Sequence, residues 1–400
     1  GQAKPKLEGP IITIGELGQT VPETDPSGKF KNMVQGVQAA LRGGSKNIQL
    51  VMTVAPNSPM GGRPKAYGAE VRQAMKEMFV ANDANLIGIE MPTSMNNLSG
   101  FDAQQGVFSE STRTKYMDEV KEAIRFVSDV GQGGGIDIVS WEFQRPISAI
   151  ASKKDGFFPE EEEVLQIVDE ETGRINAFRK NEVKLHLSLD PETGKDIFEF
   201  TKEGRPKLVL WEWKDFEKQA ERKGTTPEQE YIQMQLDARI KTTTGWAGHY
   251  AGIARDTQQQ LTAAKEAHRP EEELDKIRQK LQYEHQLALG QEQEAKELEA
   301  KRERMKPVAD YAKAKSMESY AELGIAAMDE TLNNPKVKSP IHVGPELGWP
   351  HAYGGHPKEF VELIKGARTR MVQLLTQKDY TDPRTKKTVN DPATGKPYTN

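Results

Sequence analysis

The chain has 400 residues, and its 55 Lys and Arg against 60 Asp and Glu give a formal net charge of −5. This charge offers no overall attraction to nucleic acid or to anionic membranes, and the length is enough for one large domain or two to three smaller ones. The absence of cysteine excludes disulfides and thiolate metal sites, which is compatible with a cytoplasmic protein. No run of about 18 apolar residues predicts a membrane span. The first residues resemble no signal peptide and the last are polar, so we expect a longer parent polypeptide.

Apolar strands alternate with amphipathic helices in the first part of the chain. The pattern predicts strands over 11–16, 48–54, 86–90 and 136–142, and helices over about 30–41, 69–81 and 111–130. Such βα repetition favours a parallel sheet with crossover helices, so the predicted fold class is α/β. A last strand over 341–346 and a helix to about 376 complete the pattern, and we assign 10–150 and 335–377 to one barrel-like domain.

The middle of the chain departs from this pattern. Turn residues at 171–173 and 191–194 predict two β-hairpins within an insertion over 151–213. The segment 207–213 is apolar and has Glu212 near its end. It fits equally a strand that rejoins the main sheet and the last strand of the insertion.

Residues 214–334 are predicted to form long helices. Pro227, Pro270 and Pro307 mark helix starts. The highly charged stretch 271–304 has a thin apolar stripe, which fits a projecting helical hairpin or coiled coil, or a solvated helix packed on the domain. The polar tail 378–400 is predicted to be extended or disordered.

Four of the predicted parallel strands end in a glutamate, at Glu16, Glu90, Glu142 and Glu346. In a parallel barrel these strand ends share one rim, where barrel enzymes place their chemistry. Convergent carboxylates favour Mg²⁺ or Mn²⁺, and added histidines shift the preference toward Zn²⁺ or Mn²⁺. The alternative is that some of these glutamates cap helices or pair with arginines.

Three of the seven histidines, His342, His351 and His356, lie within fifteen residues of one another around the final strand. Beside Glu346 they would make a metal or acid/base cluster. His356 is also a candidate N-cap for the helix that starts at Pro357. His249, in a segment of small and aromatic residues, is compatible with either the core or a site.

Candidate substrate contacts follow the strand ends. Asn96 and Asn97 lie in the polar loop after Glu90, Arg145 could bind an anionic group or form a surface salt bridge, and Trp349 lies beside the histidines. The chain has no dinucleotide-binding or P-loop glycine pattern and no Gly-x-Ser-x-Gly elbow.

The segments 344–346, 350–360 and 363–368, with the glutamates that end the earlier strands, resemble the xylose-isomerase-like TIM-barrel superfamily. That superfamily includes sugar isomerases and epimerases and the endonuclease IV group. The resemblance implies a (β/α)₈ barrel with a divalent metal (Mn, Mg or Zn) held by Glu, Asp and His at strand ends. Only six barrel strands can be counted rather than eight, so the barrel is either incomplete or has strands in segments assigned to helices.

The leading prediction is a metal-dependent sugar isomerase or epimerase acting on a small carbohydrate-like substrate. The residues assigned are Glu142 and His351 for catalysis, Glu142, Glu346, His356 and Glu90 for metal binding, and Asn96, Asn97, Arg145 and Trp349 for substrate contacts. A second reading is an endonuclease IV-like phosphodiesterase, which the net charge does not support. A third is a non-catalytic barrel scaffold, with residues 226–332 as an element for partner binding or self-association.

Overall fold

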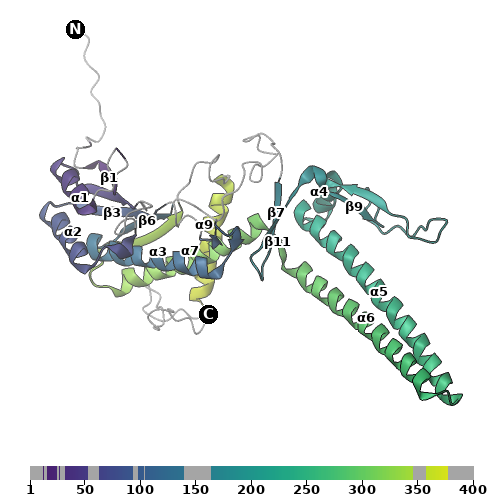
Figure 1. Cartoon of the computed structure of the whole chain (residues 1–400). Coiled ribbons are helices and arrows are strands. Elements are labelled where there is room, and N and C mark those ends of the chain that lie inside the picture. Colours follow the sequence, from purple (N-terminus) through teal and green to yellow (C-terminus); the bar gives the residue numbers. More distant parts are fainter. Residues whose placement is uncertain are drawn as a thin grey trace, which may run out of the picture. The chain divides into compact units, whose positions relative to one another are not determined.

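The computed structural model describes residues 12, 16–24, 27, 32–52, 63–92, 98–102, 104–138, 164–345 and 357–376. The chain forms two compact units, which are described separately (Figure 1). Unit 1 comprises residues 1–161 and 309–400, and unit 2 comprises residues 162–308.

Unit 1 contains a five-stranded parallel sheet. Its strands are β1 (Gly18–Pro22), β2 (Asn47–Val51), β3 (Asn85–Glu90), β6 (Gly134–Ile138) and β12 (Ile341–Pro345). They lie in the order β1-β2-β3-β6-β12, so the order in space follows the order in the chain. One register shift interrupts the pairing of β2 with β3, between Ile48 and Gln49. The predicted α/β class with a parallel sheet is confirmed.

Two helices of unit 1 begin at residues whose side chains cap them. The helices of this unit are α1 (Met33–Arg42), α2 (Ala69–Ala81), α3 (Glu110–Gly131), α7 (Val308–Asn333) and α9 (Pro357–Leu375), with a 3₁₀ turn η2 (Pro64–Ala66). The side chains of Asn32 and Ser109 accept hydrogen bonds from the first turns of α1 and α3, which satisfies backbone donors that a helix leaves open. The segment between β3 and α3 contains two short paired strands, β4 (Phe101–Asp102) and β5 (Val107–Phe108).

These helices pack against one face of the sheet. The residues buried between them come from every second position of the strands and from one stripe of each helix: Val21, Ile48, Leu50, Ile136, Ile138, Ile341, Val37, Phe79, Val127, Leu323 and Leu363. Helices α3 and α7 lie side by side (Figure 1), and the Arg113 guanidinium donates to Ser319 Oγ at 3.0 Å between them. Each fully buried aliphatic side chain stabilises the fold by about 1.5–3 kcal/mol, so this face of the sheet is fixed by its core.

The first strand differs from the prediction. A strand was expected over 11–16, ending in Glu16; residues 11 and 13–15 lie outside the described residues, Glu16 is exposed and belongs to no strand, and the first described strand, β1, lies at Gly18–Pro22. Within the described part of the chain, β1 pairs only with β2, and it buries a single apolar side chain, Val21, so this strand needs no long apolar run. Glu23, which follows β1 directly and is fully buried, takes the place at the strand end that was assigned to Glu16.

Unit 2 contains two small antiparallel sheets. In the first, β7 (Val164–Asp169) pairs with β8 (Ile175–Arg179) and with β11 (Met305–Pro307). In the second, β9 (Lys184–Leu187) pairs with β10 (Val209–Glu212), so the segment 207–213 belongs to the insertion and does not return to the main sheet. The hairpin predicted around the turn at 191–194 is closed by a single β-bridge, between Leu189 and Asp196. The strand that precedes the turn, β9, pairs with β10.

Glu212 has a local structural role. It is the N-cap of α4 (Trp213–Lys223), where its side chain and that of Asp215 form a reciprocal capping box. Capping of this kind satisfies two open backbone donors, which accounts for a glutamate at the end of β10.

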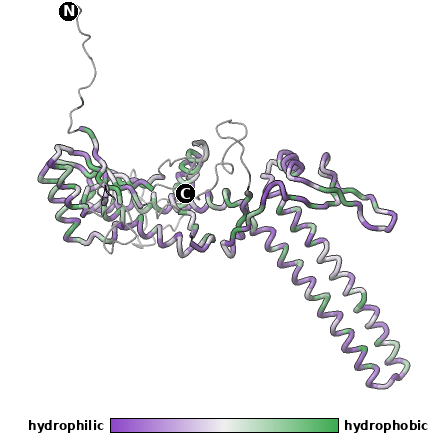
Figure 2. The backbone as a smooth tube through the Cα atoms, turned by 45° about the horizontal axis from the view of Figure 1, so that its top comes forward, coloured by the Kyte–Doolittle hydropathy of each residue, from purple (hydrophilic) through white to green (hydrophobic). Residues whose placement is uncertain are grey.

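Helices α5 (Pro227–Glu266) and α6 (Glu271–Arg304) form a long hairpin, in which they run side by side (Figure 1). Hydrophilic and hydrophobic residues alternate along both helices (Figure 2). The base of the hairpin is held by a small core of Ile167, Ile232, Leu236, Leu298 and Met305. The structure therefore forms the helical hairpin that the sequence left as one of two alternatives. Helix α7, which the sequence grouped with these helices, lies in unit 1 from residue 309 onward.

Substitution of Gly88, in the centre of the sheet, tests the close approach of β3 to β6. A Cβ atom at Gly88 would lie 2.7 Å from the carbonyl oxygen of Gly135 on the neighbouring strand. We expect Gly88→Ala to lower the free energy of unfolding by about 1–3 kcal/mol, because two backbones must move apart. Chemical denaturation measures the change. Gly344→Ala in β12 is the matched control, since no atom lies within 4 Å of its Cβ position, and equal losses in both variants would contradict the prediction.

Candidate functional site

The face of the sheet opposite the helices carries polar side chains from all five strands. We call the set Thr20, Gln49, Glu90, Asp137 and His342 the polar face. Each of these residues alternates with a residue that belongs to the core, as Asp137 does between Ile136 and Ile138, because successive side chains of a strand point to opposite faces. The polar face therefore follows from the placement of the core.

Register places these residues in two rows across the sheet. In the first row, Thr20 pairs with Gln49, Gln49 with Gly88, Gly88 with Gly135, and Gly135 with His342. In the second row, nearer the carboxyl ends of the strands, Val51 pairs with Glu90 and Glu90 with Asp137. The two acidic side chains thus occupy neighbouring positions at the edge where parallel sheets place their ligands.

A hydrogen-bonded chain crosses the polar face. Thr20 Oγ1 donates to Gln49 Oε1 at 3.3 Å, and Gln49 Nε2 donates to Asp137 Oδ2 at 2.9 Å. Gln49 and Asp137 are on strands separated by β3, a separation of about 10 Å at two strand spacings. Gly88 of β3 has no side chain between them, so the Gln49 amide can reach the carboxylate.

His342 lies across the neighbouring strand. A Cβ atom at Gly135 would come within 2.6 Å of the imidazole Nε2 of His342, so the ring occupies the space that glycine leaves open. The imidazole is exposed, whereas Asp137 is half-buried. The ring and the carboxylate are close enough to interact electrostatically.

Burial raises the pKa of Asp137 above the ordinary value of 3.8, and it outweighs the charge of His342 and the hydrogen bond from Gln49, which both lower this pKa. A carboxyl group whose pKa moves toward neutrality is better matched to proton transfer near pH 7. Asp137 beside His342 is therefore a candidate acid/base pair.

A second carboxylate lies at the end of β1. Glu23 is fully buried and accepts a hydrogen bond from the hydroxyl of Tyr67. Burial and then this hydrogen bond raise the pKa of Tyr67 far above its ordinary value of 10.0, so the phenol remains protonated and continues to donate. The ring of Tyr67 packs edge-on against Phe126 of α3, so the Glu23–Tyr67 pair belongs to the side of the sheet covered by helices.

Of the residues assigned from the sequence to catalysis, metal binding or substrate contacts, Glu90 is the one that the structure describes; the further candidates Glu16 and His342 are described as well, and His342 lies on the polar face. Glu90 is half-buried on the same face. The remaining predicted site residues lie outside the described residues: Asn96, Asn97, Glu142, Arg145, Glu346, Trp349, His351 and His356. Glu346 follows Pro345, the last residue of β12, directly in the sequence. His249 lies in unit 2, exposed on α5 against the rings of Trp246 and Tyr250.

Sequence reasoning missed Thr20, Gln49 and Asp137. Asp137 carried a signal, since a charged residue alternates there with buried isoleucines. The Gln49–Asp137 hydrogen bond joins residues 88 positions apart and has no local sequence pattern.

The described residues contain no group of three or more His, Asp or Glu side chains that could hold a metal ion. Among the helices described, none combines the length and the hydrophobicity that crossing a bilayer requires. No known protein family, curated protein or solved structure matches the chain. The resemblance to xylose-isomerase-like barrels therefore stays a prediction.

The raised pKa of Asp137 predicts a pH dependence of stability. The folded chain holds the Asp137 proton to higher pH than the unfolded chain does. The contribution of this group is therefore complete below its unfolded pKa and is lost as pH rises through its folded pKa. We expect Asp137→Asn, which cannot ionise, to gain stability relative to the wild type as pH rises from about 4 to about 8, as measured by urea denaturation at each pH.

The control is Asp83→Asn, which removes an exposed carboxylate paired with Lys46. A second variant, His342→Gln, removes the positive charge that lowers the pKa of Asp137 in the folded chain, so the loss of stability should extend to higher pH and become larger. A pH profile of the Asp137→Asn variant parallel to that of the wild type would rule out the proposed titration.

Proposed function

We propose that unit 1 is a barrel-type enzyme that isomerises or epimerises a sugar or a related polyhydroxylated carbonyl compound. The observation that carries the proposal is the acid/base pair of Asp137 and His342 on the polar face. Glu90 lies beside this pair, at the carboxyl end of β3.

The layout of the described sheet supports a barrel over a doubly wound sheet. Doubly wound sheets reverse their strand order at a switch point and carry helices on both faces. In unit 1 the strand order follows the chain order, and the described helices pack on one face. A parallel barrel has this order, with its helices outside and its chemistry at the carboxyl ends of the strands.

The composition of the polar face favours a sugar over DNA. Hydroxyl and amide groups of Thr20 and Gln49 can exchange hydrogen bonds with the hydroxyl groups of a polyol. The carboxylates of Glu90 and Asp137 would repel a phosphate backbone, which proteins bind through Lys and Arg. An endonuclease IV-like activity is therefore the weaker reading.

The proposed reaction is a proton transfer next to a carbonyl. The Asp137 carboxylate removes a proton from the carbon adjacent to the substrate carbonyl, while the His342 imidazolium donates a proton to the carbonyl oxygen, which gives an enediol. For an isomerisation, a proton is returned to the former carbonyl carbon, and the hydroxyl group on the adjacent carbon loses its proton to become the new carbonyl. For an epimerisation, a proton is returned to the opposite face of the carbon that lost it, and the other hydroxyl group loses its proton. Gln49 holds the Asp137 carboxylate in place through its hydrogen bond at 2.9 Å.

A divalent cation fits the donor chemistry of this edge of the sheet. The carboxylate of Glu90 would bind it together with Glu142, Glu346 and His356, since carboxylate and imidazole donors suit Mg²⁺, Mn²⁺ or Zn²⁺. When bound, the cation would polarise the substrate carbonyl. The described residues alone do not supply three ligands, so the proposal requires ligands from the segments after β6 and β12.

Exchange of substrate protons with solvent tests the proposed function. The protein is incubated in D₂O with a panel of aldoses and ketoses, and NMR follows deuterium entry at the carbon next to the carbonyl. We expect Asp137→Asn and His342→Gln to lower the exchange rate by about 10²–10⁴-fold, the usual contribution of general acid/base groups.

Asp83→Asn and His285→Gln, at exposed positions outside the polar face, serve as matched controls and should retain the wild-type rate. Metal content of the purified protein is measured in parallel, and Glu142→Gln and Glu346→Gln should reduce it. Rates within twofold of the wild type in both polar-face variants would refute the acid/base roles. The absence of exchange with the whole panel would refute the sugar substrate.

A second function is favoured by the surface of the α5–α6 hairpin. Trp246, His249 and Tyr250 form an aromatic cluster on α5, with ring centroids 5.7 to 6.0 Å apart. The Trp246 residue is 50% exposed, and on α6 Tyr283 and Leu289 are more than 60% exposed. Exposed aromatic residues are enriched at protein interfaces, so we propose the hairpin as an arm for self-association or for binding a protein partner.

Shortening the hairpin tests this arm. Replacing residues 243–295 with a short turn leaves the core at its base, formed by Ile232, Leu236 and Leu298 among others. We expect this variant to keep its cooperative thermal transition and to lose self-association, as measured by light scattering across a concentration series. Trp246→Ala combined with Tyr250→Ala should reproduce the loss. A mass that is monomeric and independent of concentration in the intact chain would contradict self-association.

A further inference from the structure

A cavity lies on the helix side of the sheet in unit 1, between β12, α7 and α9. Its volume is about 170 Å³. Apolar atoms make up most of its lining, which includes Val343 of β12, Gly324 of α7, and Leu363, Ala367 and Met371 of α9. Val343 alternates with His342 along β12, so this cavity and the polar face are on opposite sides of the sheet.

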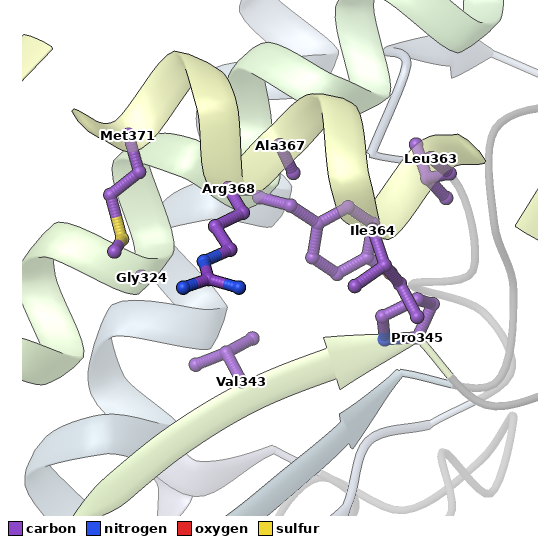
Figure 3. A pocket seen from close by; sticks show the side chains of 9 residues that line it. Gly324, Val343, Pro345, Leu363, Ile364, Ala367, Arg368 and Met371 are labelled. Atoms are coloured by element: carbon purple, nitrogen blue, oxygen red, sulfur yellow. The ribbon is translucent and has the colours of Figure 1, made fainter. Parts of the chain in front are cut away.

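Arg368 provides the charge of the cavity. Its side chain extends from α9 toward Val343, between Met371 and Ile364 (Figure 3). The Arg368 side chain is exposed at the mouth of the cavity. A guanidinium at the opening of an apolar cavity is arranged to meet an anionic group whose remainder is apolar.

The neighbouring cations already have carboxylate partners. Arg370, two residues further along α9, forms a bidentate pair with Glu318 at 2.7 and 3.1 Å. Lys313 pairs with Glu362. Arg368, by contrast, has no ion pair or hydrogen bond with any described residue, so none of these residues competes with a ligand for its five N–H donors.

The helix that forms one wall of the cavity contains a glycine at the contact. Gly324 lies within α7, where glycine is less favourable than alanine because it loses more backbone freedom on folding. A Cβ atom at this position would lie 2.9 Å from the Sδ of Met371. The glycine therefore lets the Met371 side chain occupy its place in the cavity wall.

We propose that this cavity binds a small carboxylic acid with an apolar group of about six carbons. A cavity of about 150 Å³ accommodates benzene, so the volume fits a phenyl ring or a branched alkyl chain of similar size. The carboxylate pairs with the planar guanidinium of Arg368, which matches it in a bidentate geometry. The apolar group lies among Val343, Leu363 and Met371. The proposal is independent of the proposed isomerase activity, because the two sites use different faces of the sheet.

Titration of the full chain with model ligands tests the proposal. The methionine methyl groups are labelled with ¹³C, and the Met371 signal, assigned by a Met371→Leu variant, reports occupancy of the cavity. Phenylacetate carries both the ring and the carboxylate, benzyl alcohol carries the ring without the charge, and acetate carries the charge without the ring. We expect saturable shifts with phenylacetate, weaker binding of benzyl alcohol, and no saturation with acetate.

Arg368→Gln should weaken phenylacetate binding by about 10- to 100-fold, the value of a charge-assisted pair, and leave benzyl alcohol binding unchanged. Arg370→Gln, on the same helix as Arg368, breaks the pair with Glu318 of α7; it is the matched control and should retain wild-type affinity. Ala367→Leu, which fills the cavity, should abolish binding of both ring compounds, with circular dichroism as the check on folding.

Three outcomes would overturn the proposal: no saturable shift of Met371 with phenylacetate, equal weakening by Arg368→Gln and Arg370→Gln, or unchanged affinity in a folded Ala367→Leu variant. Saturation by acetate with the same affinity as phenylacetate would likewise overturn it, because a guanidinium that binds any carboxylate makes no use of the cavity.

Discussion

Burial of one face of the parallel sheet against its helices is the constraint on which the rest of unit 1 depends. Ile48, Leu50, Ile136 and Ile138 are fully buried in this core. Because a shift of one residue would turn every side chain of a strand to the other face, the core fixes the register of all five strands. The polar face is therefore determined by the same contacts that stabilise the fold, and its residues are positioned without contributing to the core themselves.

Two glycines turn that polar face into a connected site. Gly88 and Gly135 present no side chains where β3 and β6 cross the middle of the sheet. This leaves room for the Gln49 amide to reach Asp137 and for the His342 ring to lie over Gly135. The glycines weaken the strands as such, but they bring groups from β2, β6 and β12 into contact. The burial that this packing imposes is also what raises the pKa of Asp137.

Local sequence patterns predicted much of the fold and little of the candidate site. Helices α2 and α3 and strand β3 lie close to their predicted bounds, because periodicity and caps such as Ser109 are local signals. Strand β1 was not predicted, because it buries only Val21 and is less apolar as a segment than the run over 11–16. The pairing of β9 with β10 and the Gln49–Asp137 hydrogen bond join residues far apart in the chain, so they depend on tertiary packing that periodicity does not encode.

The pairing of β7 with β11 has a topological consequence. These strands lie near the first and last residues of unit 2, and their pairing sets Ile167 opposite Pro307, so the chain enters and leaves the sheet of this unit on neighbouring strands, one strand spacing of ~5 Å apart. Arg304 reinforces the closure through Asp169, at 3.2 and 3.4 Å. A segment that enters and leaves on neighbouring strands can be inserted, deleted or changed in length at a single point of a chain. The strand order of unit 1 includes no strand of unit 2, so the two units can diversify independently.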